Sequence, residues 1–351
     1  MHPRRPLLVL LLAAPLLLAG CNPFYVARAG WAQAQILASR EPLEQVMTDP
    51  SIDEETRGKL RFAWDGRRFA VEELDFRNAG DSYTSFARLP SDTLALVLSA
   101  AYRDRLAFRT WWFPITGRVP YRAYFSESGA IQARDRMERE GYDTYLRPTA
   151  AFSTLGWFAD PVYSTLLRQD EIGVVTTIVH ELAHNHLFLP GRGRFNESYA
   201  TFAGHAGAIA FFCGRKGGGP DTLRCGRARD RWHDARVVSG YLMALESEIR
   251  GLYARDDIPP EEKAGRRGEI YEEAVVRFRE EVQPRLRILS YGYLAGEGLN
   301  NATLLSRTLY FHRLEDFHRA WEEEWNRDLA AMMMWIREAA PEEDDPFGIL
   351  D

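Results

Sequence analysis

Residues 174–188 read VVTTIVHELAHNHLF and contain the pattern His-Glu-x-x-His, formed by His180, Glu181 and His184. Side chains four residues apart on a helix lie on the same face, about one turn apart, so both imidazoles can reach one ion. The neighbouring Glu181 can take a proton from a water held in the same site. This spacing predicts that His180 and His184 bind Zn²⁺ and that Glu181 acts as a general base.

The flanking residues predict the helix that this motif requires. Asp170 is a candidate N-cap, apolar residues recur at helical spacing from Glu171 to Leu187, and Pro190-Gly191 ends the run. The alternative interpretation is a buried helix with two satisfied core histidines. That interpretation leaves Glu181 as a buried carboxylate without a partner, which is energetically costly. The sequence therefore favours a metal site.

A catalytic zinc ion usually has three protein ligands and keeps a fourth position for water. The residues after the turn, FNESYATFAGHAGAIAFF at 195–212, predict a second helix that opens near Asn196. A two-helix hairpin would return Glu197 to the histidine face, and we predict it as the third ligand. His205 is the alternative ligand, whereas His186 is expected to face away. Asn196 is expected to cap the helix, to orient a ligand or to bind the substrate backbone.

The amino terminus has the pattern of an exported lipoprotein. Two arginines precede an apolar segment at 7–18, which is too short for a comfortable membrane span and leads into Leu-Ala-Gly-Cys at 18–21. This tetrapeptide resembles the bacterial lipobox, in which the cysteine is lipid-modified and becomes the new N-terminus. We expect residues 1–20 to be a signal peptide and Cys21 to carry the lipid anchor. The alternative is an ordinary export signal with a chance cysteine.

Such an anchor places the protein at the periplasmic face of a bacterial membrane. Asn22 is not the Asp of the commonest inner-membrane retention rule, which slightly favours the outer membrane. Removing 20 residues from 351 leaves 331, enough for one large domain or two modest ones. We expect a domain at 21–340, with room for two lobes that meet near residue 170, and a loose acidic tail at 341–351.

Charge and cysteine content limit the partners. The formal net charge of −6 argues against nucleic-acid binding, so a peptide substrate and the membrane are the expected partners. Cys213 and Cys225 flank a glycine-rich segment and can close a small loop as a disulfide in an oxidising compartment. They can equally remain free thiols. Oligomeric state does not follow from the sequence.

The segments before the metal helix mix helical and strand patterns. Helices are expected at 24–40, 53–64 and 130–140, strands at 67–74 and 82–89, and a sheet core within 96–116. AFSTLG at 151–156 is a candidate edge strand that could hold the substrate backbone by strand addition. A core strand explains this segment equally well. The later third of the chain is expected to be mostly helical.

Hydrolysis of an amide also needs a hydrogen-bond donor to the tetrahedral intermediate. The glycine- and asparagine-rich segment at 290–306 could approach the metal helix. The candidate donors in and after this segment are Tyr293, Tyr310 and His312. Spacing does not distinguish between them.

Several segments, in order, resemble the bacterial putative aminopeptidase family, whose members are inferred to be zinc peptidases and are often lipoproteins. The carrying segments are YVARAGWAQAQILASREPL at 25–43, VPYRAYF at 119–125, GYDTYLRPTAAFSTLGWFADPV at 141–162, IVHELAHNHLF at 178–188, FNESYATF at 195–202 and NNATLLSRTLY at 300–310. The resemblance implies His180 and His184 as ligands, Glu181 as base and Glu197 as third ligand. Asn185, His186 and the polar HRLEDF at 312–317 depart from the family pattern. The chain also lacks the Gly-x-Met-Glu-Asn signature by which another aminopeptidase family holds a free amine.

The sequence thus predicts an α+β, thermolysin-like zincin with a small mixed sheet before the metal helix and a mostly helical C-terminal half. The expected activity is zinc-dependent hydrolysis of peptide bonds. One alternative is a non-catalytic lipoprotein assembly or interaction factor on a peptidase scaffold. Another is a metal amidase that acts on cell-wall peptides. Glu181 counts against the first alternative, because a structural zinc site usually has four protein ligands and needs no base.

Overall fold

The metal-motif helix is the central element of the structure. It is α6 (Glu171–His186), and both α4 (Glu54–Glu72) and α7 (Gly193–Gly214) pack against it. Its start is capped as predicted, because the Asp170 side chain accepts a hydrogen bond from the backbone N–H of Gly173 at 2.9 Å. Most of its residues are buried, including Glu181 and His184.

The computed structural model describes residues 30–31, 34–89, 91, 93–113, 117–149, 159–214, 218–296 and 298–351. The predicted signal peptide, the predicted lipid anchor at Cys21 and the candidate edge strand at 151–156 lie outside these ranges, as do residues 24–29 and 32–33 of the helix expected at 24–40. Within the described part of the chain, no helix is long and apolar enough to cross a membrane.

Three small sheets come before α6 in the chain. The first has the order β6-β3-β7 and is antiparallel, with β3 (Ala95–Ala101) between β6 (Tyr121–Tyr124) and β7 (Asp143–Thr149). The second, β1 (Glu41–Pro42), β2 (Ser85–Ala87) and β8 (Val162–Tyr163), has one antiparallel and one parallel pair. The third pairs β4 (Trp111–Phe113) with β5 (Gly117–Val119). The predicted mixed sheet upstream of the metal helix is therefore present.

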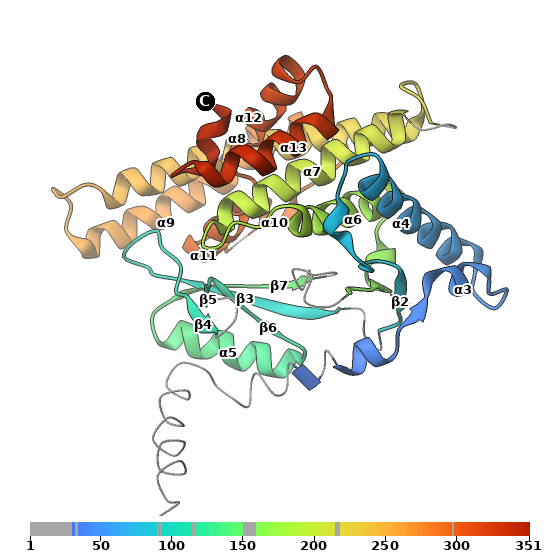
Figure 1. The fold of residues 1–351 in the computed structure, drawn as a ribbon. Coiled ribbons are helices and arrows are strands. Elements are labelled where there is room, and N and C mark those ends of the chain that lie inside the picture. The colour runs from blue at the N-terminus through green and yellow to red at the C-terminus, as the bar shows by residue number, and fades with distance from the viewer. Residues whose placement is uncertain are drawn as a thin grey trace, which may run out of the picture.

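Helices cover both sides of the first sheet. α5 (Glu127–Arg139) lies along one face, and α11 (Asn301–Thr308) packs against β3 and β7 on the side of the helical layer (Figure 1). The other helices of this layer are α8 (Leu223–Tyr253), α9 (Pro260–Arg277), α10 (Gly292–Ala295), α12 (Leu314–Arg319) and α13 (Leu329–Ala339). A short α3 (Leu43–Thr48) precedes α4. The mostly helical C-terminal half agrees with the prediction.

The strand predicted at 67–74 is wrong, because residues up to Glu72 belong to α4. The residues that α4 buries recur at helical spacing: Leu60, Ala63, Gly66, Phe69 and Ala70. This period continues the helix through the segment whose short alternation resembled a strand.

Residue 170 does not separate two cores. One apolar cluster contains Leu60 of α4, Val175 of α6 and Met332 of α13, all fully buried. Elements from both sides of that position therefore share a single core. The division into two lobes that meet near this residue stays a prediction.

The C-terminal tail is also packed rather than loose. Residues Pro346–Leu350 form a turn of 3₁₀ helix in which Phe347 and Leu350 are buried. The Phe347 ring lies 5.2 Å from the Phe195 ring of α7. Although the segment before it is acidic, these apolar side chains gain more from burial than the tail loses in conformational freedom.

Cys213 and Cys225 form a disulfide with Cα atoms 4.8 Å apart. It joins the end of α7 to the first turn of α8. The second helix of the hairpin is thus covalently tied at the end that lies far from the metal motif.

Replacing Phe347 with alanine tests the packing of the tail. Phe347→Ala should lower the free energy of unfolding by about 3–5 kcal/mol, because it removes a buried aromatic ring. Leu223→Ala is the control, since Leu223 is 78% exposed, and it should change stability by less than about 0.5 kcal/mol. Urea denaturation followed by circular dichroism measures both. Equal midpoints for Phe347→Ala and the wild type would show that the tail is loose after all.

Candidate metal centre

His180, His184 and Glu197 come together where α6 meets α7. Glu197 Oε2 lies 3.6 Å from His180 Nε2 and 3.5 Å from His184 Nε2. One candidate ligand atom from each residue lies within 4.8 Å of the other two, and among the described residues no other group of acids, histidines or cysteines does so. The structure therefore brings together the three residues that the sequence predicts as ligands.

The donor set and its spacing fit a zinc ion. Two ligand atoms on one tetrahedral zinc, each about 2.0–2.1 Å from the metal, are about 3.3 Å apart. The separations of 3.5 and 3.6 Å between the carboxylate and the imidazoles are close to that value. The side chains of His180 and Glu197 are 16% and 17% exposed, so the three residues are not sealed from solvent.

Two glycines of α7 allow this helix to pack closely against α6. A Cβ atom on Gly204 would lie 2.6 Å from the Thr176 carbonyl oxygen, and one on Gly207 would lie 2.8 Å from Val179 Cγ1. Real Cβ atoms essentially never come so close to other heavy atoms, so both positions require glycine at this helix separation. α7 begins at Gly193 rather than near Asn196, which places Glu197 in its second turn instead of its first.

Asn196 belongs to the connection between the two helices. Its side chain accepts a hydrogen bond from the Leu189 N–H and donates one to the Leu189 carbonyl, both at 2.9 Å. It is 2% exposed. Both ends of its amide are thus hydrogen-bonded to the backbone between the two helices. Asn196 therefore fixes this connection instead of capping α7, orienting a ligand or binding substrate.

The two acids of the centre have opposite electrostatic environments. Burial raises the pKa of Glu181, although the nearby His180 and His184 partly oppose it. Burial also acts to raise the pKa of Glu197, but His184 and His180 outweigh that effect and hold it well below its usual range. Glu197 is therefore a carboxylate suited to bind a cation, and Glu181 is a stronger base than an ordinary glutamate.

The remaining histidines near the motif lie elsewhere. His186 Nε2 is 3.3 Å from the Met333 carbonyl oxygen, and its ring lies 4.4 Å from that of Phe76. The His205 ring packs 5.5 Å from Trp232, and burial lowers its pKa to about 3. Among the described residues, neither lies in the candidate group of His180, His184 and Glu197.

Of the three candidate donors, Tyr310 lies at the centre. Its ring stacks on that of His180, with centroids 6.1 Å apart and planes 20° apart. Tyr293 instead lies under the Arg307 guanidinium, whose carbon is 3.7 Å from the ring centroid. The His312 ring packs 4.9 Å from that of Phe347, and burial lowers its pKa to about 4, so its candidate role stays a prediction without a described contact to the centre.

Sequence reasoning missed Arg147 and Tyr121, which the sheet brings to the same centre. Arg147 of β7 donates a hydrogen bond to the Tyr310 hydroxyl at 3.1 Å. Tyr121 of β6 is 36% exposed, but the surrounding protein desolvates its hydroxyl and the charge of Glu197 acts in the same direction, so its pKa is raised. Both residues lie within segments that carried the family resemblance, but local spacing assigns them no role.

Comparison with known proteins agrees with that resemblance. No curated protein and no solved structure matches the chain. A family described as "Putative aminopeptidase" matches residues 24–345. The family description indicates a hydrolase that acts on peptides. The chain therefore belongs to the putative aminopeptidase family.

Proposed function

We propose that this protein is a zinc-dependent peptidase with a thermolysin-like catalytic centre. The observation that carries the proposal is the convergence of His180, His184 and Glu197, with the buried Glu181 beside them. Membership of the putative aminopeptidase family supports the same reaction class. A non-catalytic zinc site has no use for a base with a raised pKa next to its ligands.

In this proposal each histidine contributes one imidazole nitrogen to the ion, and Glu197 contributes a carboxylate oxygen. A zinc ion, when bound, acts as a Lewis acid that lowers the pKa of water to about 7. Glu181 takes the proton of the attacking water and then delivers a proton to the departing amine. Its raised pKa favours both steps, because a stronger base accepts the proton more readily and still returns it near neutral pH.

Tyr310 is the proposed donor to the tetrahedral intermediate. Arg147 donates to the oxygen of its hydroxyl, so the hydroxyl proton remains available for another acceptor. Burial, and then the charge of Glu197, raises the pKa of Tyr310, which keeps the hydroxyl protonated. The stacking on His180 holds this donor beside the metal ligands.

The proposal includes the lipid anchor at Cys21 and a position at the periplasmic face of a bacterial membrane, with the outer membrane slightly preferred. It rests on the sequence pattern at 1–21 alone. The segment at 151–156 remains a prediction for the strand that holds the substrate backbone.

Purified protein loaded with zinc should be tested on free-amine peptides, acetylated peptides and cell-wall muropeptides. Cleavage of free-amine peptides alone would support an aminopeptidase, and cleavage of both free and acetylated peptides an endopeptidase. Hydrolysis of muropeptides alone would indicate the cell-wall amidase. No hydrolysis of any of them by zinc-loaded protein would favour the non-catalytic alternative.

Glu181→Gln should lower kcat by about 10²–10⁴-fold or more, because the amide cannot accept the proton of water. Zinc content should stay at one ion per chain, since Glu181 is not a ligand. Peptide hydrolysis and elemental analysis measure the two quantities. Glu171→Gln, on the same helix but paired with Arg224, is the control and should keep the wild-type rate. A wild-type rate in Glu181→Gln would refute the mechanism.

His184→Ala should lose zinc together with activity, because two remaining protein ligands hold the ion much more weakly than three. Plasma mass spectrometry after exhaustive dialysis gives the zinc content. His233→Ala is the matched control, because His233 lies on α8 outside the ligand group. Retention of stoichiometric zinc by His184→Ala would contradict the ligand assignment.

Tyr310→Phe should lower kcat by about 10²–10³-fold with little change in KM, because the lost hydroxyl acts in the transition state. Steady-state kinetics on the best peptide separates the two constants. Tyr293→Phe is the control, since Tyr293 contacts Arg307 instead of the metal ligands. An equal loss in the two variants would argue against Tyr310 as the donor.

A further inference from the structure

Two arginines beside the centre have tyrosine partners and no acidic ones. Arg147 of β7 donates to the Tyr310 hydroxyl, and Arg307 of α11 donates to the Tyr145 hydroxyl. Some other partly buried arginines pair with carboxylates, as Arg231 does with Asp170 at 2.7 Å, and others donate to backbone carbonyls, as Arg67 does to Ser82. Among the described residues, no carboxylate oxygen lies within 4.0 Å of either Arg147 or Arg307. Neither arginine therefore forms an ion pair with a described carboxylate, although the charge of Glu197 acts on Arg147 from farther away.

The Arg307 guanidinium is arranged as a recognition group. It stacks 3.7 Å above the Tyr293 ring and contacts the Tyr145 ring at 5.2 Å. Its Nε atom and the Tyr293 hydroxyl are both buried, and neither has a hydrogen-bond partner among the described residues. A guanidinium stacked on an aromatic face keeps its in-plane N–H groups for a planar, two-oxygen acceptor.

Arg147 connects this group to the metal ligands. Its guanidinium carbon lies 5.5 Å from the Tyr310 ring, which in turn lies 6.1 Å from the His180 ring. The charge of Arg147 also acts on Tyr293, as that of Arg307 does. The two arginines thus line one side of the centre. A peptide extends by about 3.3–3.6 Å per residue, so this side lies within a few residues of the bond to be cleaved.

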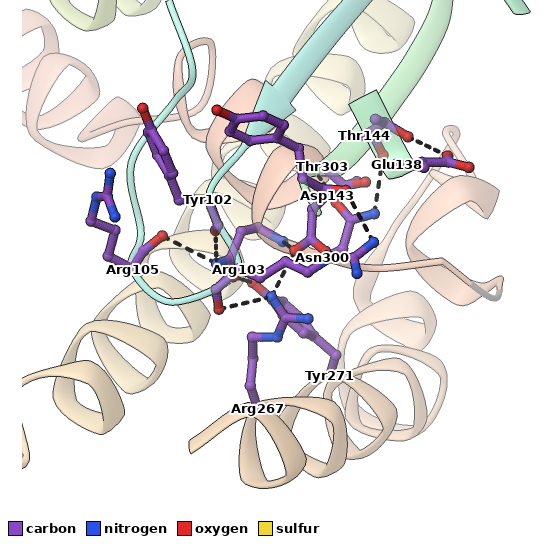
Figure 2. A network of polar contacts seen from close by, with 12 residues as sticks. Tyr102, Arg103, Arg105, Glu138, Asp143, Thr144, Arg267, Tyr271, Asn300 and Thr303 are labelled. Carbon is purple, nitrogen blue, oxygen red and sulfur yellow. Dashed lines mark hydrogen bonds and ion pairs between the residues drawn. The ribbon is translucent and has the colours of Figure 1, made fainter. Parts of the chain in front are cut away.

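A polar network holds β7, which carries Arg147, against α11, which carries Arg307. Asp143, at the start of β7, accepts hydrogen bonds from Arg103 at 3.1 Å and from Arg267 of α9 at 2.8 Å (Figure 2). The Asn301 N–H at the start of α11 also donates to Asp143, at 3.1 Å. Asn300 donates to the Thr144 carbonyl at 3.0 Å. β7 and α11 are therefore fixed against each other before any ligand arrives.

We propose that Arg147 and Arg307 form a subsite that binds a carboxylate of the peptide substrate, on one side of the cleaved bond. This inference rests on the proposed peptidase function and narrows its substrate class to peptides with a carboxylate at that position. Paired guanidinium groups match the two oxygens of a carboxylate, and neither arginine is already held in an ion pair with a described carboxylate. The carboxylate is either the C-terminal group of a short peptide or an Asp or Glu side chain.

Binding to the inactive Glu181→Gln protein tests the subsite without turnover. The probes are tetra-alanine, its C-terminal amide, and two amidated peptides that differ only in Glu or Gln at the third residue. Isothermal titration calorimetry should show that at least one carboxylate peptide binds about ten- to a hundredfold more tightly than its neutral match. Preference for the free acid identifies the C-terminal group, and preference for Glu identifies the side chain. Equal affinity within both pairs would overturn the proposal.

Arg307→Gln in the Glu181→Gln background should remove that preference, and Arg307→Lys should keep only part of it, because lysine lacks the planar fork. Arg266→Gln, at an exposed pair with Glu262, is the control and should keep the full preference. Circular dichroism and zinc content report whether each variant is folded. If folded Arg307→Gln keeps the full preference for carboxylate peptides, other residues cause that preference and the proposed subsite is wrong.

The two proposals fail in different ways. If wild-type protein cleaves peptides but neither pair shows a preference, the subsite is wrong and the peptidase stands. If carboxylate peptides bind selectively but zinc-loaded wild-type protein cleaves none of them, the peptidase is wrong and the subsite stands.

Discussion

The close contact between α6 and α7 is the constraint on which the rest of the site depends. Gly204 and Gly207 leave no side chain between the helices, since a Cβ atom at either position would come within 2.6–2.8 Å of α6. At this separation a carboxylate on α7 reaches two imidazoles on α6, as Glu197 does. Asn196 fixes the connection between the helices through Leu189, and the Cys213–Cys225 disulfide ties the far end of α7 to α8.

This packing creates the electrostatic difference between the two acids. Both carboxylates are in a low-dielectric environment, which raises the pKa of each. Only Glu197 lies close enough to both imidazoles for their charge to reverse that effect. The result is one carboxylate that stays ionised and one that is more basic than usual. Opposed pKa shifts of neighbouring groups are typical of sites that separate an electrostatic role from an acid-base role.

Helices α6 and α7 carry the candidate metal ligands, and the antiparallel sheet β6-β3-β7 contributes side chains to the same centre. β6 carries Tyr121 and β7 carries Arg147, while α11 and the residues that follow it carry Arg307 and Tyr310. Because Asp143 binds groups from α9 and α11, the sheet and the helical layer meet in a fixed register. The helices thus provide the candidate chemistry, and the contact between β7 and α11 provides the positive charge beside it.

The sequence by itself determined the features that depend on spacing within one element: the two histidines on one face, Glu181 between them, and the Asp170 cap. It also indicated Glu197, because a short connection leaves few ways to pair two helices. Only the tertiary structure placed Tyr310, rather than Tyr293 or His312, against His180, and only it brought Arg147 to Tyr310, which lies 163 residues away in the chain. The strand expected at 67–74 and the loose tail expected from its acidic residues were both wrong, because side chains of each segment are buried against other elements. A side chain's local pattern specifies the face it occupies, but the element it meets is set by packing across the whole core.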